Sequence, residues 1–232
     1  MDGITLVLLP GMDGTGLLFG PLIETLDGRF KTEVVAYPPA TPLSYEELLP
    51  IVEAALPREA PYILLGESFS GPLAIMAASE NPKNMRALIL VSTFIRNPLP
   101  WLPKRARVLA RPPLFKLSRS FIVAKALASG HASPLLIGLL NKAHSMVAPS
   151  VMASRAKSIL SVEVEANLKA VRAPVFLLRG ANDLVVPRKN LRDIQTARQD
   201  IRVFTIPGPH LILQTRPSES AAIIGRIADM IE

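Results

Sequence analysis

The sequence of 232 residues contains no cysteine, which excludes disulfides, thiolate nucleophiles and cysteine-ligated metals. It has three histidines, so we expect no metal site built from several imidazoles, and no residue pattern calls for a cofactor. Intrinsic disorder is excluded as well, because 49% of the residues are hydrophobic and 19% are charged. A chain of this length and composition is expected to fold as one domain, with room for a small insertion.

Long apolar runs are also missing. No run approaches the roughly 18 apolar residues that would suggest a membrane-spanning helix. The first five residues, Met-Asp-Gly-Ile-Thr, lack the basic start and the apolar stretch of a signal peptide. We therefore expect no transmembrane segment and a cytoplasmic location.

Acidic residues are absent between Asn81 and Val162, a segment that holds 13 of the 26 basic residues. The rest of the chain carries 13 basic and all 19 acidic residues, so this segment supplies the whole excess behind the net charge of +7. It is either an ordinary exposed basic face or a surface that attracts an anionic partner, such as an acidic carrier protein or an anionic lipid surface. The segment matches no nucleic-acid-binding module, so nucleic acid is not an expected partner.

Short apolar runs alternate with helical patterns along most of the chain. The run 4–9 is apolar except for Thr5 and ends at Pro10-Gly11, which is typical of a strand buried on both faces. Ser44 and Glu47 have the spacing of a capping box at the start of a helix. Such alternation predicts a parallel sheet with helical crossovers. We predict strands at 4–9, 34–37, 62–65, 87–91, 175–178 and 203–206, and helices at 17–26, 44–56, 69–80 and from 217 onward.

The segment 94–171 interrupts this alternation. It begins with three closely spaced prolines and continues with helical patterns that contain no obvious strand. We interpret it as a helical cap, inserted into an α/β core that is formed by residues 1–93 and 172–232.

The sequence GESFSG at 66–71 lies directly after a predicted strand and directly before a predicted helix. A serine at such a sharp turn, here Ser68, is held in a strained and exposed position that suits a nucleophile. The usual pattern is Gly-x-Ser-x-Gly, because backbone and helix pack too closely there for large side chains. Here Ser70 occupies the last position and Gly71 follows it.

Two further polar residues follow predicted strands, Asp183 after 175–178 and His210 after 203–206. Alone, each is better explained as a turn residue or a loop histidine. Together with Ser68 they stand in the order Ser, Asp, His, and all three follow parallel strands. Because ligand sites form at the C-terminal edge of a parallel sheet, we expect the three side chains to converge there.

These motifs resemble those of the α/β-hydrolase family over nearly the whole chain. The sequence LPGMDGTG at 9–16 is similar to the oxyanion loop of an esterase and thioesterase-like branch, and GANDLVVP at 180–187 resembles the acid loop. The family often begins with two antiparallel strands for which this chain has no room. The resemblance therefore implies an α/β-hydrolase fold with a mostly parallel sheet of about six strands and a helical cap.

The resemblance also implies roles for individual residues. Ser68 would attack a carbonyl carbon, His210 would take its proton, and Asp183 would orient the imidazole. The backbone N–H groups of Met12 and Phe69 would bind the oxyanion. As candidates for the substrate pocket we name the apolar residues Phe19, Phe94, Trp101 and Leu184.

We therefore expect a serine carboxylesterase that acts on a small-molecule acyl ester of short or medium chain length. The alternative is a thioesterase or acyltransferase that uses thioesters of an acyl carrier protein or of coenzyme A, which the basic segment would favour. A non-catalytic module that binds a membrane or a partner is a third interpretation. The intact Ser68, Asp183 and His210 set argues against it.

Overall fold

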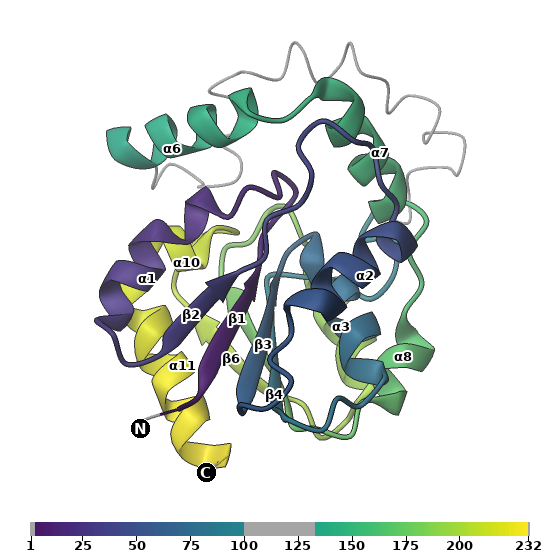
Figure 1. The fold of residues 1–232 in the computed structure, drawn as a ribbon, viewed down its shortest axis with the longest axis vertical. Coiled ribbons are helices and arrows are strands. Elements are labelled where there is room, and N and C mark those ends of the chain that lie inside the picture. Colours follow the sequence, from purple (N-terminus) through teal and green to yellow (C-terminus); the bar gives the residue numbers. More distant parts are fainter. Residues whose placement is uncertain (1–2, 100–132, 232) are drawn as a thin grey trace.

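The computed structural model describes residues 3–99 and 133–231, which build a central six-stranded sheet flanked by helices (Figure 1). The strand order is β2-β1-β3-β4-β5-β6, and every pairing between neighbouring strands is parallel. The predicted six-stranded α/β architecture is confirmed. The strands are β1 (Thr5–Leu9), β2 (Lys31–Val34), β3 (Tyr62–Glu67), β4 (Met85–Val91), β5 (Val175–Gly180) and β6 (Arg202–Ile206).

Strand β2 lies three residues earlier than the sequence predicted. It is an edge strand that pairs with β1 alone, and its residues alternate between exposed and half-buried, so it needs no apolar run. Of the apolar residues that suggested a strand at 34–37, only Val34 belongs to β2; the others follow the end of the strand. There Val35 donates its N–H to Leu8 at 3.1 Å, and the buried Tyr37 donates its N–H to Gly14 at 2.8 Å.

Helices cover both faces of the sheet, and each face has its own apolar core (Figure 1). Leu6 and Leu8 of β1 point into one core, whereas Val7 and Leu9 point into the other, as the two-residue period of a strand requires. The first core is covered by η1 (Leu17–Phe19), α1 (Gly20–Leu26), α10 (Ile212–Thr215) and α11 (Pro217–Ile231). The second core is covered by α2 (Tyr45–Ala55), α3 (Ser70–Ser79), α8 (Glu165–Ala170) and α9 (Arg188–Ala197).

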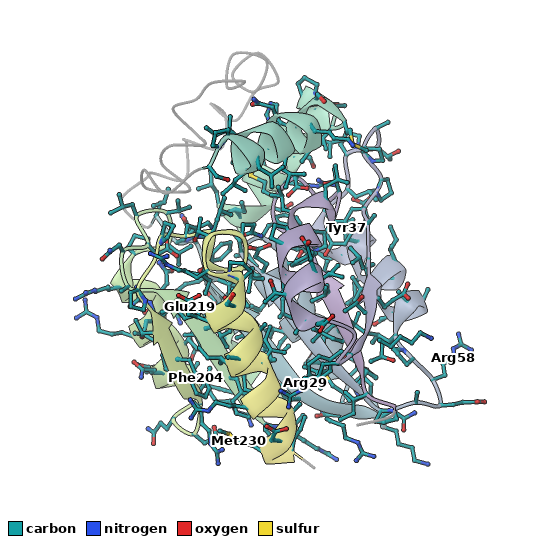
Figure 2. The ribbon with its side chains drawn as sticks, turned by 90° about the vertical axis from the view of Figure 1, so that its left-hand side faces the viewer. Arg29, Tyr37, Arg58, Phe204, Glu219 and Met230 are labelled. Carbon is teal, nitrogen blue, oxygen red and sulfur yellow. The ribbon has the colours of Figure 1, made fainter. Side chains whose placement is uncertain are left out.

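Side-chain contacts at helix ends fix several of these elements. The predicted capping box opens α2: the Ser44 hydroxyl accepts the Glu47 N–H, and the Glu47 carboxylate accepts the Ser44 N–H at 2.8 Å. Arg29, in the turn before β2, binds α11 through the Gly225 carbonyl and the Asp229 carboxylate (Figure 2). Helix α9 was not predicted, although Leu191, Ile194 and Ala197 recur at helical spacing and pack against the second core.

Helices α6 (Pro134–Ser145) and α7 (Pro149–Ile159) lie beyond the C-terminal ends of the strands (Figure 1). They belong to the segment predicted as a cap, as does α8. Helix α8, however, packs beside α3 and α9 and places Leu168 in the core. Within 3–99 and 133–231, no helix combines the length and apolar character needed to cross a membrane.

Candidate active site

Ser68 occupies the sharp turn between β3 and α3. Its backbone has φ of +50°, which is strained for a residue with a side chain, and this aims the hydroxyl away from the sheet. A Cβ on Gly66 would lie 2.6 Å from the Ser70 carbonyl oxygen, and one on Gly71 would lie 2.0 Å from Thr93 Oγ1. The two glycines are therefore needed to bring strand, turn and helix this close.

Ser70, which departs from the usual motif, has a hydrogen-bonding function of its own. Its buried hydroxyl donates to the carbonyl of Pro10 and accepts the Tyr37 hydroxyl at 2.6 Å. This side chain thus ties helix α3 to the start of the loop that follows β1.

Asp183 and His210 lie in the loops after β5 and β6, which are neighbouring strands. The loops touch through their backbones, since Asn182 donates its N–H to the Gly208 carbonyl at 2.9 Å. A Cβ on Gly180 would lie 2.0 Å from the Pro209 carbonyl oxygen, so only glycine permits this approach. The spacing between the acid and the histidine is consequently set by two packed backbones.

The three side chains form one continuous hydrogen-bond path. His210 Nδ1 lies 2.8 Å from Asp183 Oδ2, and His210 Nε2 lies 2.9 Å from Ser68 Oγ. An ionised carboxylate only accepts, so Nδ1 carries the proton and Nε2 accepts the Ser68 hydroxyl proton. The structure therefore brings together the three side chains that the sequence singled out.

The charge of Asp183 is stabilised in a buried position. Burial by itself raises the pKa of this carboxyl. The hydrogen bond from His210, the electrostatic effect of that imidazole and the N–H groups of Val186 and Val185 together outweigh burial, and the pKa lies below its usual range. Oδ1 is held by those two N–H groups at 2.9 Å each, which leaves Oδ2 for the histidine.

A pocket of about 320 Å³ opens above Ser68 and His210 and is mostly apolar. Phe94 lines it, as predicted. Phe19 is buried in the core instead, and its neighbour Leu18 lines the pocket; Leu184 is 74% exposed and is not part of the lining. Trp101 lies outside the described residues. The apolar lining residues that were not among these candidates come from several elements and comprise Pro98, Leu99, Leu140, Ala143, Met152, Ile159, Val185, Val186 and Leu211.

Glu67 lines the same pocket beside the nucleophile, although its side chain is only 2% exposed. Its Oε1 accepts the amide of Gln214 at 3.0 Å. Burial raises the pKa of Glu67 to about 7, against the lowering effects of the Gln214 hydrogen bond and the charge of His210. A second titrating group thus lies next to the site.

Comparison with known proteins identifies the family of this chain. Residues 43–217, well over half of the chain, match the family described as alpha/beta hydrolase fold. The chain belongs to the α/β-hydrolase family.

A curated relative of this α/β hydrolase is Phytyl ester synthase 1, chloroplastic, from Arabidopsis thaliana, which is 38% identical over 112 residues. The match covers 44% of this chain and 16% of the plant protein, so the chain corresponds to a small part of that relative.

Solved structures of similar fold include an enol-lactonase from Burkholderia xenovorans LB400, with a TM-score of 0.82 and 15% identity over 99% of this chain and 92% of the other. A lipase-esterase related protein from Clostridium acetobutylicum ATCC 824 has a TM-score of 0.77 and 16% identity over 96% and 93% of the two chains. At these identities the likeness shows a shared fold.

The two predicted oxyanion donors of the hydrolase lie on different loops, Met12 after β1 and Phe69 after β3. Met12 lines the pocket, and Phe69 directly follows the serine. Within the described ranges, neither the Met12 N–H nor the Phe69 N–H has a hydrogen-bond acceptor. The Phe69 ring stacks on Tyr45, with 4.7 Å between ring centroids, and its carbonyl accepts the Tyr45 hydroxyl at 2.8 Å. These contacts fix the turn that carries one expected donor.

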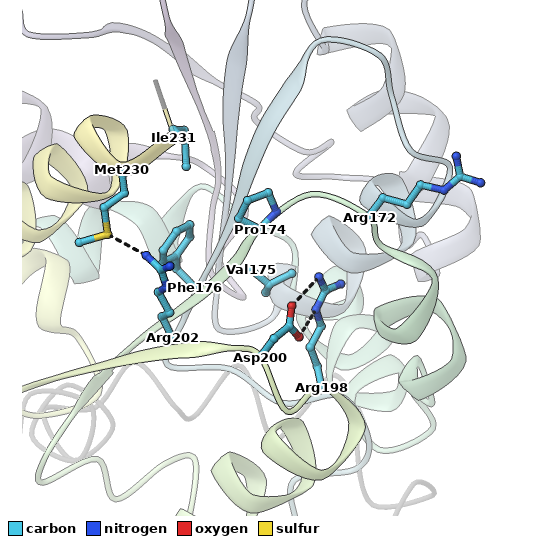
Figure 3. A pocket seen from close by; sticks show the side chains of 9 residues that line it. All are labelled: Arg172, Pro174, Val175, Phe176, Arg198, Asp200, Arg202, Met230 and Ile231. Atoms are coloured by element: carbon cyan, nitrogen blue, oxygen red, sulfur yellow. Dashed lines mark hydrogen bonds and ion pairs between the residues drawn. The ribbon is translucent and has the colours of Figure 1, made fainter.

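A second hollow, of about 290 Å³, lies beside the N-terminal ends of β5 and β6 and the C-terminal end of α11; Figure 3 shows the side chains that line it. Its polar groups are mostly engaged with one another: Arg198 binds Asp200 and nearby carbonyl oxygens, and Arg202 donates to Met230 Sδ. It contains no nucleophile with an adjacent base, so the candidate active site is the pocket at Ser68. Among the described residues no group of three histidines or carboxylates is arranged to hold a metal.

Proposed function

We propose that this α/β hydrolase is a serine carboxylesterase that cleaves esters with short or medium apolar acyl chains. The observation that carries the proposal is the Ser68–His210–Asp183 hydrogen-bond path at an apolar pocket. A neutral imidazole within 2.9 Å of a serine hydroxyl can take its proton, and an apolar lining favours an apolar acyl group.

In the acylation step, Ser68 Oγ attacks the ester carbonyl carbon while its proton passes to His210 Nε2. The carbonyl oxygen becomes an oxyanion, for which the N–H groups of Met12 and Phe69 are the proposed donors. Asp183 stabilises the imidazolium. His210 then protonates the departing alkoxy oxygen, the carbon–oxygen bond breaks, and an alcohol leaves with the acyl group on Ser68.

In the deacylation step, water occupies the place of the alcohol. His210 takes one proton from it, and the resulting hydroxide oxygen attacks the acyl carbon. The second tetrahedral intermediate collapses when His210 returns the proton to Ser68 Oγ. The products are the carboxylic acid and the restored enzyme.

The test is hydrolysis of p-nitrophenyl esters from acetyl to palmitoyl by wild type and Ser68→Ala. Turnover by wild type, with an optimum at short or medium chains and its loss in Ser68→Ala, is the expected result. Ser79→Ala serves as the control, because that hydroxyl lies at the far end of α3 and bonds the Met76 carbonyl. Equal activity in wild type and Ser68→Ala would refute the proposal.

The second candidate is acyl transfer, and the match to a relative named as an ester synthase favours it. An alcohol would then replace water in the second step, so the acyl-enzyme would yield a new ester. Adding a long-chain alcohol to the assay distinguishes the two: alkyl ester as the main product indicates transfer, and free acid indicates hydrolysis.

For such transfer, the proposed acyl donors are thioesters of an acyl carrier protein or of coenzyme A. The positive charge of the basic segment would attract these anionic molecules. Seven of its 13 basic residues fall within 100–132, outside the described residues. Turnover of carrier-bound thioesters that falls with added salt, while neutral esters react as before, would support this partner.

A further inference from the structure

Arg155 is a buried arginine on α7, in the segment that was predicted as a cap. It is 1% exposed. Its Nη1 donates to the carbonyl oxygens of Met12 at 2.9 Å and Asp13 at 2.6 Å, and its Nη2 donates to that of Pro38 at 3.3 Å. Within 3–99 and 133–231, no carboxylate forms an ion pair with it. A buried charge is costly unless it is hydrogen-bonded, so these carbonyl contacts are what keep Arg155 in place.

The surroundings of the guanidinium are shaped to it. It lies 5.6 Å from the ring centroid of Tyr37 and 5.9 Å from that of Phe69, within the range of cation–π attraction. Gly14 has φ of +68°, and a Cβ there would lie 2.5 Å from Arg155 Nη1. The loop therefore curves closely around this side chain. Lysine has a point charge rather than a planar fork and cannot reproduce all of these contacts.

The contacts converge on the loop at 10–14, which carries one expected oxyanion donor. On one side, the buried Ser70 hydroxyl donates a hydrogen bond to the Pro10 carbonyl. From the side of α7, Arg155 holds the carbonyls of Met12 and Asp13. The Met12 N–H lies between the two anchors, and the residue with the other expected donor, Phe69, has its ring against the same guanidinium.

We propose that Arg155 is a positioning residue that holds the loop at 10–14 so that the Met12 N–H faces the oxyanion formed at Ser68. The inference rests on the proposed serine hydrolase function and adds to it a residue that never touches the substrate. By fixing the carbonyl of Met12, Arg155 limits rotation of the backbone on both sides of that residue. The donor is then in place before the reaction begins, which is the condition under which such donors act most strongly.

The test compares Arg155→Met and Arg155→Lys with Lys157→Met, which removes the same charge from an exposed position on the same helix. Loss of a whole oxyanion donor lowers kcat by about 10²–10³-fold, so loosening its loop should lower kcat by about 10–100-fold in Arg155→Met. KM should change less than about threefold, because the substrate pocket is not lined by Arg155. We expect an intermediate loss in Arg155→Lys and almost none in Lys157→Met.

Two further readouts separate positioning from a general loss of structure. Affinity for an alkyl boronic acid, which forms a tetrahedral adduct with the serine, should fall by a factor similar to that of kcat. Amide hydrogen exchange of residues 11–14 should become faster in Arg155→Met, while exchange in β3 and β5 stays as in wild type. If Arg155→Met does not fold, Arg155→Lys decides on the same readouts.

The proposal is overturned if a folded Arg155 variant keeps kcat within threefold of wild type, loses efficiency through KM alone, or shows unchanged exchange at 11–14. A wild type without Ser68-dependent turnover would instead refute the proposed function. The exchange experiment needs no substrate, so it would still decide whether Arg155 holds the loop.

Discussion

Glu67→Gln should make the stability of the protein less sensitive to pH. The pKa of this buried carboxyl is raised from 4.5 to about 7. Below pH 4.5 it is protonated in both the folded and the unfolded chain and contributes no pH dependence. Between pH 4.5 and 7 the unfolded chain releases the proton while the folded chain retains it, so the free energy of unfolding falls as pH rises. Above pH 7 the carboxyl is ionised in both the folded and the unfolded chain, and the free energy of unfolding falls no further on its account.

The size of the effect follows from the shift. A displacement of about two and a half pKa units, at about 1.4 kcal/mol each, amounts to about 3 kcal/mol of lost stability by pH 7. Glutamine carries no titrating group and keeps a carbonyl oxygen that can accept the Gln214 amide. Relative to wild type, the free energy of unfolding of the variant should therefore rise by about 3 kcal/mol between pH 4.5 and 7 and stay constant at higher pH.

The measurement is urea unfolding followed by circular dichroism from pH 4 to pH 9, for both proteins. Using the difference between them removes the contributions of all other titrating groups. Glu53→Gln, at an exposed position on α2, is the control and should show a flat difference. A flat difference for Glu67→Gln, or one that falls as pH rises, would refute the reasoning.

Three further substitutions test the site and its scaffold. Asp183→Asn should lower kcat by about 10⁴-fold, because an amide can donate to His210 Nδ1 and favour the wrong tautomer; an ester assay checks this, and a loss below tenfold would contradict it. Gly71→Ala should destabilise the fold by about 1–3 kcal/mol, since its Cβ would lie 2.0 Å from Thr93 Oγ1. Gly138→Ala, in an open position on α6, should instead stabilise it by up to about 1 kcal/mol. Thermal denaturation should show a lower Tm for Gly71→Ala and an equal or higher Tm for Gly138→Ala than for wild type.

The fold and the convergence of Ser68, Asp183 and His210 could be predicted because both depend on local signals. Each of the three residues follows an apolar run within five residues, and parallel strands bring such positions to one edge of the sheet. The predictions were wrong where the local sequence signal was weak or where neighbouring residues lie in different environments. The edge strand β2 needs little hydrophobicity, and a shift of one residue around η1 separates Leu18, in the pocket, from Phe19, in the core.

Two other contacts between distant segments, which no motif marks, could not be predicted. Arg155 is one of 13 basic residues in an acid-free segment, and no sequence feature marks it as the one that reaches Met12, 143 residues away. The pairing of Glu67 with Gln214 spans 147 residues and joins β3 to α10. Such contacts depend on how separate elements pack, which the spacing of residues along one element does not encode.

The pairing of β4 with β5 has a consequence for how the segment between them can vary among proteins of this fold. The chain leaves the sheet after β4, builds α6 to α8, and returns to pair Val91 with Leu178. Doubling the length of such an excursion costs only about 0.6 kcal/mol of closure entropy, so its size can vary while the strand order stays the same. This excursion supplies part of the pocket lining, whereas Ser68, Asp183 and His210 all lie outside it. Arg155 is where the excursion and the rest of the chain constrain each other, because a replaced α7 must still supply a donor to the loop below it.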